Sequence, residues 1–218
     1  MNLPIVQSLT AVTLAGGGPF SRRELQFCLK RAPIAVAADG GADRLLRYRC
    51  LPEAVIGDFD SLSDAARAEL PADRLHHFAE QATTDFDKAL RSIRAPVVLA
   101  LGFAGARLDH GLAAMNTLVS RAAQACILIG PEDIAFAAPP HLTLDMRKGD
   151  VLSLFPMALV TGRSQGLEWP IDGIEFAPDG MIGTSNAVSG PVHLRFDADR
   201  MLVILPRSAL RAALAGLL

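Results

Sequence analysis

The chain has 218 residues, half of them hydrophobic, and a formal net charge of −2. This length and apolar content suit one large domain or two modest ones with packed cores, and they exclude wholesale disorder. The near-neutral charge argues against a protein that binds nucleic acid through phosphate contacts. No apolar run reaches the roughly 20 residues of a membrane helix. No Lys or Arg precedes residue 22, so we expect no secretory signal and a cytoplasmic protein.

The first 130 residues alternate short apolar runs with helical patterns. The runs predict strands at 10–15, 34–38, 54–56, 75–78, 97–101 and 127–129. The patterns between them predict helices at 21–31, 43–48, 64–70, 84–94 and 108–123. Short continuous apolar runs separated by helices are typical of buried parallel strands. This part of the chain therefore predicts an α/β domain, at 1–132, with helices packed over a mostly parallel sheet.

The pattern changes near residues 131–140, where proline becomes frequent. Short apolar runs then predict strands at 141–144, 151–155, 158–161, 192–196 and 201–205, with a closing helix at 208–217. Turn residues separate these runs, among them Ser189, Gly190 and Pro191. The second part, at 138–218, is therefore predicted to be an all-β domain of the sandwich or barrel type.

The acidic residues are mostly aspartate, with 16 Asp against 7 Glu. Aspartate is a poor helix former, so this excess indicates turns and caps, or short carboxylates that bind a divalent ion. The three cysteines, Cys28, Cys50 and Cys126, are far apart and form no pair with metal-ligand spacing. They exclude a disulfide framework and a zinc knuckle, and each is interpreted as a small buried hydrophobe.

Two acidic clusters follow predicted strands directly. In the first, Asp39, Gly40 and Gly41 lead into a helix. Paired glycines allow close approach of the backbone to a ligand, and the helix offers its N–H groups to phosphate. An ordinary turn in which Asp39 caps the helix also explains this pattern. In the second, Asp58 and Asp60 flank Phe59. On extended backbone the two carboxylates point the same way, about 6.5–7 Å apart, and Phe59 points into the fold.

Like charges so placed repel unless a cation lies between them, so the second cluster favours a metal site. The alternative is that Asp60 or Ser61 caps the helix beginning near Asp64. Such a cap explains one carboxylate and leaves Asp58 unexplained.

A third cluster spans residues 81–88. Thr84 and Asp87 resemble a capping box, and Asp85 and Lys88 are three residues apart on the first helical turn. Capping does not require Asp85, which is free to reach back towards Asp58 and Asp60.

The fourth cluster, at 102–110, again runs from a strand into a helix. Asp109, Ala113 and Asn116 share one helical face, and they are expected to form the wall of a polar pocket. Arg107 suits bidentate phosphate binding or a simple ion pair with Asp109. A neighbouring apolar stripe consists of Leu108, Leu112, Met115 and Val119.

Together the four clusters place carboxylates, a guanidinium and two glycine-rich turns along one sheet edge, which is where open parallel sheets bind ligands. This combination suits metal-bound polyphosphate, because its chemistry needs charge neutralisation and alignment. The chain has no GxxxxGK[ST] loop, and residues 16–19 lack the GxGxxG spacing.

In this order the motifs resemble those of the thiamine pyrophosphokinase (thiamine diphosphokinase) family. The matching segments are ADGGADRLL, PEAVIGDFDSL, TTDFDKAL, RLDHGLAAMNTL, GLEWP and GTSNAVSG, which together cover nearly the whole chain in family order. The resemblance implies transfer of pyrophosphate from ATP to the hydroxyethyl group of thiamine, with magnesium, giving thiamine diphosphate and AMP. It also implies a homodimer whose active site lies at the subunit interface.

The resemblance also implies the roles of particular residues. The implied metal ligands are Asp58, Asp60 and Asp85, which form the catalytic set together with Arg107 and Asp109. The implied nucleotide-binding residues are Asp39, Gly40, Gly41, Ser61, Lys88, Arg107 and Asn116. The implied thiamine-binding residues are Gln81, Trp169, Ser185 and Asn186. Asp85 and Asp109 both remain candidates for the base that accepts the hydroxyl proton.

Two positions depart from the family pattern: Ala82 stands where a carboxylate is usual, and Ala106 where a glycine is usual. Both leave the principal carboxylates in place. Two alternative functions stay open, namely a pyrophosphokinase for another alcohol of the hydroxymethylpterin kind, and a non-catalytic sensor of thiamine or nucleotide. The tryptophan also has the ordinary interpretation of a core residue, and the stretch at 183–186 that of a polar turn.

Overall fold

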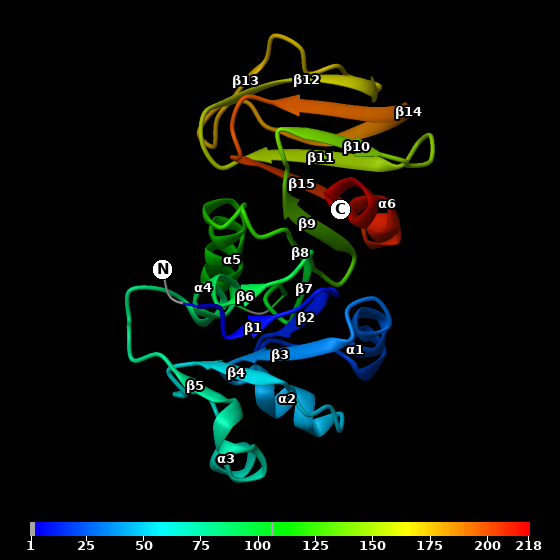
Figure 1. Cartoon of the computed structure of the whole chain (residues 1–218). Coiled ribbons are helices and arrows are strands. Elements are labelled where there is room, and N and C mark those ends of the chain that lie inside the picture. The colour runs from blue at the N-terminus through cyan, green and yellow to red at the C-terminus, as the bar shows by residue number, and fades with distance from the viewer. Residues whose placement is uncertain (1–2, 106) are drawn as a thin grey trace.

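The computed structural model describes residues 3–105 and 107–218. Six parallel strands form the first part of the fold (Figure 1): β2 (Val12–Ala15), β3 (Ile34–Ala38), β4 (Ala54–Gly57), β5 (Leu75–His77), β7 (Val98–Leu101) and β8 (Cys126–Ile129). The helices between them are α1 (Arg22–Leu29), α2 (Gly41–Arg47), α3 (Asp64–Glu69), α4 (Asp85–Arg91) and α5 (Leu108–Ser120), with a short 3-10 turn, η1 (Ala72–Arg74). The predicted parallel sheet with alternating helices is confirmed.

The parallel strands lie in the order β8, β7, β2, β3, β4, β5. The chain builds outward from β2 in one direction and then returns to the other side of β2 with β7. Such a reversal leaves a crevice beyond the carboxyl ends of the central strands. Those strands are β7, β2, β3 and β4.

Helices cover both faces of this sheet because alternate strand residues point to opposite sides. Leu99 and Leu101 belong to a core that includes residues of α1, α2 and α3, whereas Val98 and Ala100 belong to a second core with α4 and α5. The first core continues into the second part of the chain, through residues such as Leu152 and Val203.

The second part is antiparallel. Its strands are β9 (Asp133–Ala137), β10 (His141–Leu144), β11 (Val151–Pro156), β12 (Val160–Leu167), β13 (Glu175–Phe176), β14 (Gly183–Phe196) and β15 (Met201–Pro206), followed by η2 (Arg207–Ala209) and α6 (Leu210–Leu217). β9 pairs with β8 and also with β15, so the hydrogen-bonded ladder runs from one part of the chain into the other. The proline-flanked stretch at 131–140 therefore contains a strand, which the sequence did not predict.

Two further sequence-based expectations were wrong. The helix predicted at 84–94 ends at Arg91, because β6 (Ile93–Arg94) pairs in parallel with β1 (Val6–Gln7). Residues 183–186, for which a polar turn was one interpretation, and the predicted turn residues 189–191 both belong to the fourteen-residue strand β14.

Other expectations hold in part. Cys28 and Cys126 are buried, whereas Cys50 is only half-buried. Among the described residues, no helix combines the length and apolar character needed to cross a membrane.

Candidate active site

A cavity of about 660 Å³ lies at the carboxyl ends of the central parallel strands. Nine of the residues predicted to form the site line it: Asp39, Gly40, Asp58, Asp60, Ser61, Gln81, Asp85, Lys88 and Arg107. They come from the ends of β3 and β4, from the beginning of α4 and from the segment before α5. The expectation that these clusters meet at one sheet edge is thus confirmed by the structure.

Close backbone packing builds the floor of this cavity. A Cβ on Gly41 would overlap the carbonyl oxygen of Ala15, and one on Gly18 would lie 2.5 Å from the carbonyl oxygen of Gly102. These glycines let the turns after β2, β3 and β7 pack against one another. Gly41 itself does not line the cavity; its contribution is to this packing.

Asp39 is the most unusual residue of the cavity. Its side chain is 3% exposed, its φ is 44°, and its Oδ2 accepts a hydrogen bond from Ser61 N at 3.0 Å. Within 3–105 and 107–218, Asp39 Oδ1 has no hydrogen-bond partner although it is buried. Asp39 does not cap α2, which begins after Gly40 without a side-chain cap. Burial, together with the charges of Asp85 and Asp60, raises the pKa of Asp39 to about 6.

This raised pKa predicts a specific pH dependence of stability. The folded protein holds the Asp39 proton more tightly than the unfolded chain, so stability is lost as the pH rises from about 4 to about 6. Asp39→Asn should therefore exceed the parent protein in stability at pH 7 by about 2–3 kcal/mol, in buffer with EDTA. Urea unfolding from pH 4 to pH 7 measures this. A difference that stays constant with pH would contradict it.

The backbone at Asp58 and Asp60 is not extended. Phe59 has a φ of 65°, and Asp60 N lies 3.3 Å from Asp58 Oδ1, to which it donates a hydrogen bond. This turn, rather than strand alternation, brings the carboxylates together: one oxygen each of Asp39, Asp58 and Asp60 lie within 4.8 Å of one another. The Phe59 ring packs at 5.4 Å from the ring of His77, between centroids.

Neither Asp60 nor Ser61 caps the next helix. Ser63 does so, since its side chain accepts a hydrogen bond from Ala66 N at 3.1 Å. Ser63 also donates to Asp43 through its hydroxyl group. The capping interpretation of Asp60 is therefore wrong, and its carboxylate is left at the cavity.

Lys88 joins the second and third clusters. Its side chain is 1% exposed, and its Nζ lies 3.0 Å from both Asp58 Oδ2 and Asp85 Oδ1. The hydrogen bond from Lys88 is the main reason that the pKa of Asp58 is below its ordinary value. The predicted proximity of Asp85, Lys88 and Asp58 is confirmed.

The capping box of α4 is only half formed. Thr84 accepts from Asp87 N at 3.3 Å, but the Asp87 carboxylate pairs with Arg121 at 2.7 and 2.9 Å. Since Arg121 lies just after α5, this ion pair ties α4 to the end of α5.

The fourth cluster contributes less than its spacing predicts. Arg107 lines the cavity and makes a bidentate ion pair with Asp109, at 3.1 and 2.5 Å, on an exposed surface. Asp109 and Asn116 do not line the cavity, whereas Ala114 does. The expected apolar stripe is also incomplete, because Leu108 and Leu112 are 79% and 62% exposed. Ala106 lies outside the described residues.

The predicted thiamine-binding residues of the second part do not reach this cavity. Trp169, Ser185 and Asn186 lie on or beside β12 and β14, and none of them lines it. Trp169 is 60% exposed, so the interpretation of the tryptophan as a core residue is wrong. Within one chain the predicted site residues therefore form two separate groups.

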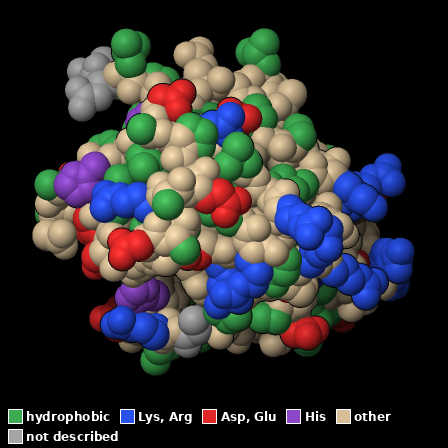
Figure 2. Space-filling model, turned by 90° about the horizontal axis from the view of Figure 1, so that it is seen from below, with side chains coloured by type: hydrophobic (Ala, Val, Ile, Leu, Met, Phe, Trp, Pro, Cys, Tyr) green, Lys and Arg blue, Asp and Glu red, His purple; other side chains and the backbone are tan. Residues whose placement is uncertain are grey.

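Sequence reasoning missed one wall of the cavity, formed by Gly17, Gly18, Arg44 and Arg47. Arg44 Nε donates to Gly17 O at 3.2 Å, which joins α2 to the turn after β2. The glycine run was set aside because it lacks a dinucleotide-binding spacing, yet its place after a strand was the useful signal. Seen from below, Lys and Arg side chains gather on the side of α1 and α2 (Figure 2), which carry Arg22, Arg23, Arg44 and Arg47.

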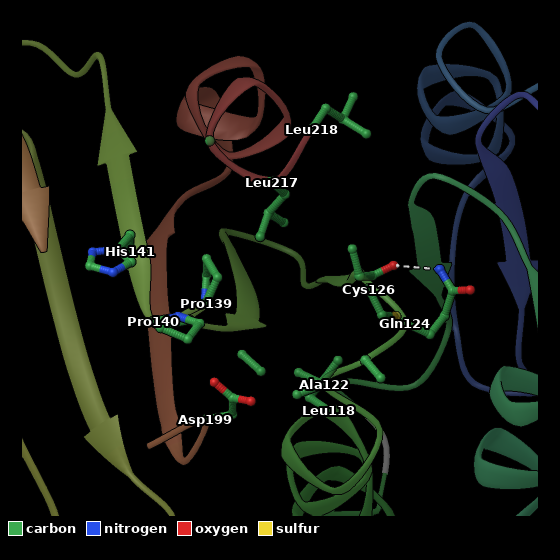
Figure 3. Close-up of a pocket in the computed structure, with 15 residues that line it drawn as sticks. Leu118, Ala122, Gln124, Cys126, Pro139, Pro140, His141, Asp199, Leu217 and Leu218 are labelled. Atoms are coloured by element: carbon green, nitrogen blue, oxygen red, sulfur yellow. Dashed lines mark hydrogen bonds between the residues drawn. The ribbon is translucent and has the colours of Figure 1, made fainter. Parts of the chain in front are cut away.

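A second cavity, of about 410 Å³, lies between α5, β9 and the C-terminal helix α6 (Figure 3). Small and apolar side chains line most of it, with Asp199, His141 and Gln124 at its border. None of the predicted site residues lines it, and Leu118, at the end of the segment RLDHGLAAMNTL, belongs to its wall.

Known families match both parts of the chain. A model described as the catalytic domain of thiamin pyrophosphokinase matches residues 25–129, and one described as its vitamin B1 binding domain matches residues 141–201. Together they span about three quarters of the 218 residues. The chain belongs to the thiamin pyrophosphokinase family. It is accordingly an enzyme of the class that pyrophosphorylates thiamine.

Relatives with both parts support this membership. Thiamine pyrophosphokinase 1 of Oryza sativa subsp. japonica is 27% identical over 213 residues, which cover 82% of this chain and 81% of the relative. Thiamin pyrophosphokinase from Candida albicans superposes with a TM-score of 0.74 at 16% identity, covering 94% of this chain and 92% of that one. The enzyme from Bacillus subtilis gives 0.69 at 21% identity, covering 90% and 98%. The two structures show that the fold is shared.

Proposed function

We propose that the chain transfers a pyrophosphate group from ATP to the hydroxyethyl oxygen of thiamine, giving thiamine diphosphate and AMP. The observation that carries this proposal is the convergence of Asp39, Asp58, Asp60, Asp85 and Lys88 on one cavity in a member of this family. A polyphosphate needs charge neutralisation and alignment, and this set of groups, with a bound cation, supplies both.

The carboxylates fit a magnesium ion. The buried Asp39 Oδ1 lacks a hydrogen-bond partner among the described residues, and oxygens of Asp39, Asp58 and Asp60 lie within 4.8 Å of one another. Carboxylate oxygens are the ligands that magnesium prefers. We assign Asp58, Asp60 and Asp85 as its ligands, with Asp39 beside them. Magnesium bound there would neutralise phosphate charge and draw electrons from the β-phosphorus.

The chain's own residues then bind and orient the reactants. Lys88 holds Asp58 and Asp85 in place through its two ion pairs. Arg107 offers a planar guanidinium for the phosphates, and its ion pair with Asp109 keeps it at the cavity rim. Gly40 and Ser61 bring backbone groups close to the nucleotide, Gly41 allows the close packing behind them, and Asn116 lies further along α5.

The proton of the thiamine hydroxyl goes to a carboxylate at this site, either Asp85 or Asp109. Both are within reach of the cavity: Asp85 lines it, and Asp109 is bound to the lining residue Arg107. The pH–rate profiles of Asp85→Asn and Asp109→Asn decide between them, since only removal of the base eliminates the acidic limb.

The thiamine-binding group of Trp169, Ser185 and Asn186 completes the site across a subunit interface. None of these three residues lines the cavity within one chain, and this supports the arrangement. We therefore propose a cytoplasmic homodimer. In it, residues 1–132 form the nucleotide-binding domain, and residues 138–218 form a sandwich-like domain for thiamine binding and dimerisation. Gln81 supplies a further polar contact at the mouth of the cavity.

A mass-resolved assay with purified protein, thiamine, ATP and magnesium tests this function. We expect thiamine diphosphate and AMP in equal amounts, with no product in EDTA. Thiamine monophosphate with ADP would contradict pyrophosphoryl transfer. Turnover of a hydroxymethylpterin but not of thiamine would contradict the substrate, and binding of both ligands without turnover would favour a sensor.

A further inference from the structure

Trp169 has a surface position that its own side chain does not explain. It is the only tryptophan of the chain, and it is 60% exposed. Leu167 and Ile171, two residues before and after it, are both buried. An indole ring that is mostly exposed gains little from burial, so burial contributes little to holding it there. Its position is set by its backbone.

The side chain of Asn186 makes two hydrogen bonds to that backbone. Asn186 Nδ2 donates to Trp169 O at 2.7 Å, and Trp169 N donates to Asn186 Oδ1 at 3.2 Å. The same Oδ1 accepts from Ala187 N at 2.8 Å. Asn186 is 7% exposed, so the amide is buried and three of its four hydrogen-bonding positions are used within the chain.

These bonds extend the sheet beyond the point where backbone pairing stops. The last residue pair between β12 and β14 is Leu167 with Val188, and Glu168 N donates to Ala187 O at 2.8 Å. Asn186 then takes the place of a strand neighbour for Trp169. A single amide that both donates and accepts can reproduce the hydrogen bonds of a backbone peptide group.

The far side of the tryptophan is fixed as well. Ile171 N donates to Ser164 Oγ at 3.1 Å, and Ser164 N donates to Asp172 Oδ2 at 3.2 Å. Ile171 is 2% exposed and anchors the segment in the core. With Pro170 between them, the residues before and after the ring are both held.

We infer that Asn186 is a positioning residue that fixes Trp169 as a rigid platform for the cationic ring of thiamine, rather than a residue that contacts thiamine. The inference rests on the proposed function for the identity of the ligand. A platform fixed in advance costs less ordering on binding, and an aromatic face attracts a cation. Asn186 thus belongs to the thiamine-binding group through Trp169.

A double-mutant cycle of Asn186→Ala and Trp169→Ala tests the inference. Each single variant should raise the KM for thiamine about tenfold with kcat changed less than about twofold, and the double variant should be no worse than Trp169→Ala. Near-UV circular dichroism and fluorescence anisotropy of the single tryptophan should both fall in Asn186→Ala. Asn186→Asp, which places a carboxylate oxygen instead of a donor against Trp169 O, should also lower both.

Gln165→Ala is the matched control, because Gln165 is exposed on β12, four residues before Trp169, and its side chain forms no hydrogen bond with any residue the structure describes. It should leave KM and both spectroscopic signals unchanged. A further rise in KM from Asn186→Ala in the Trp169→Ala background would overturn the inference, as would a rise in KM without any change in the tryptophan signals.

The same experiments distinguish a failure of the proposed function from a failure of the inference about Asn186. If the parent protein forms no thiamine diphosphate, the function is wrong, but the tryptophan signals of Asn186→Ala still show whether Asn186 holds the ring. Quenching of Trp169 fluorescence by thiamine alone then shows whether the ring is a thiamine platform. Unchanged tryptophan signals in Asn186→Ala would overturn the positioning role of Asn186. Absence of quenching by thiamine would overturn the role of Trp169 as a thiamine platform.

Discussion

Asp60→Asn should lower kcat by at least about 10³-fold, equivalent to about 4 kcal/mol of transition-state stabilisation, while the protein stays folded. The reason is that Asp60 is one of three residues whose carboxylate oxygens lie within 4.8 Å of one another, yet it is exposed. Its carboxylate accepts a hydrogen bond from the Ser61 hydroxyl at 2.9 Å. An exposed carboxylate contributes little to folding, so the loss should fall on the chemistry.

The measurement is steady-state turnover at saturating magnesium, combined with a titration of Mn²⁺ binding followed by paramagnetic resonance. Asp64→Asn serves as the control, because it removes an exposed carboxylate four residues away that does not line the cavity. We expect weaker Mn²⁺ binding and lost turnover for Asp60→Asn alone. Equal turnover in the two variants would remove Asp60 from the metal site.

The position of the cavity could be predicted from the sequence because two strong signals coincide. The apolar runs at β3 and β4 define buried parallel strands, and Asp39 and Asp58 follow their last residues directly. Once the strands are parallel, their carboxyl ends must meet at one edge. The residues of this cluster could therefore be predicted from their order along the chain, without knowledge of contacts between distant segments.

The local geometry could not be predicted in the same way. Phe59 and Asp39 both have positive φ values, of 65° and 44°. Aspartate tolerates such a value, but the bulky phenylalanine does not favour it. Tertiary contacts impose these values: the Phe59 ring packs on His77, and Asp39 is held by Ser61 N. Strand alternation predicted the right pair of carboxylates from an extended backbone conformation that these residues do not adopt.

The second part of the chain misled sequence analysis for a different reason. Gly190 and Pro191 are turn residues by preference, but they lie within β14 where its pairing changes partners. Pairing with β12 is interrupted between Val188 and His193, and Gly166, with a φ of 79°, passes against the carbonyl of Pro191. A proline is tolerated in a strand at such an irregularity, and only the partner strand reveals it.

Lys88→Met should destabilise the protein by about 3 kcal/mol in buffer with EDTA. Lys88 is 1% exposed and is the shared cation of Asp58 and Asp85, whose side chains are 11% and 29% exposed. Methionine fills a similar volume but leaves two neighbouring carboxylates without their cation. Lys148→Met is the control, since Lys148 is exposed and distant from the cavity; it should change stability by less than about 0.5 kcal/mol.

Magnesium should restore more stability to Lys88→Met than it adds to the parent protein. In the variant a divalent cation faces carboxylates with no competing ammonium group, so its binding contributes more to the folded state. Thermal unfolding with and without magnesium measures both increments. Equal gains in stability for the two proteins would mean that Asp58 and Asp85 gain nothing from the ion when Lys88 is absent. The metal would then have to lie on Asp39 and Asp60, away from the Lys88 ion pairs.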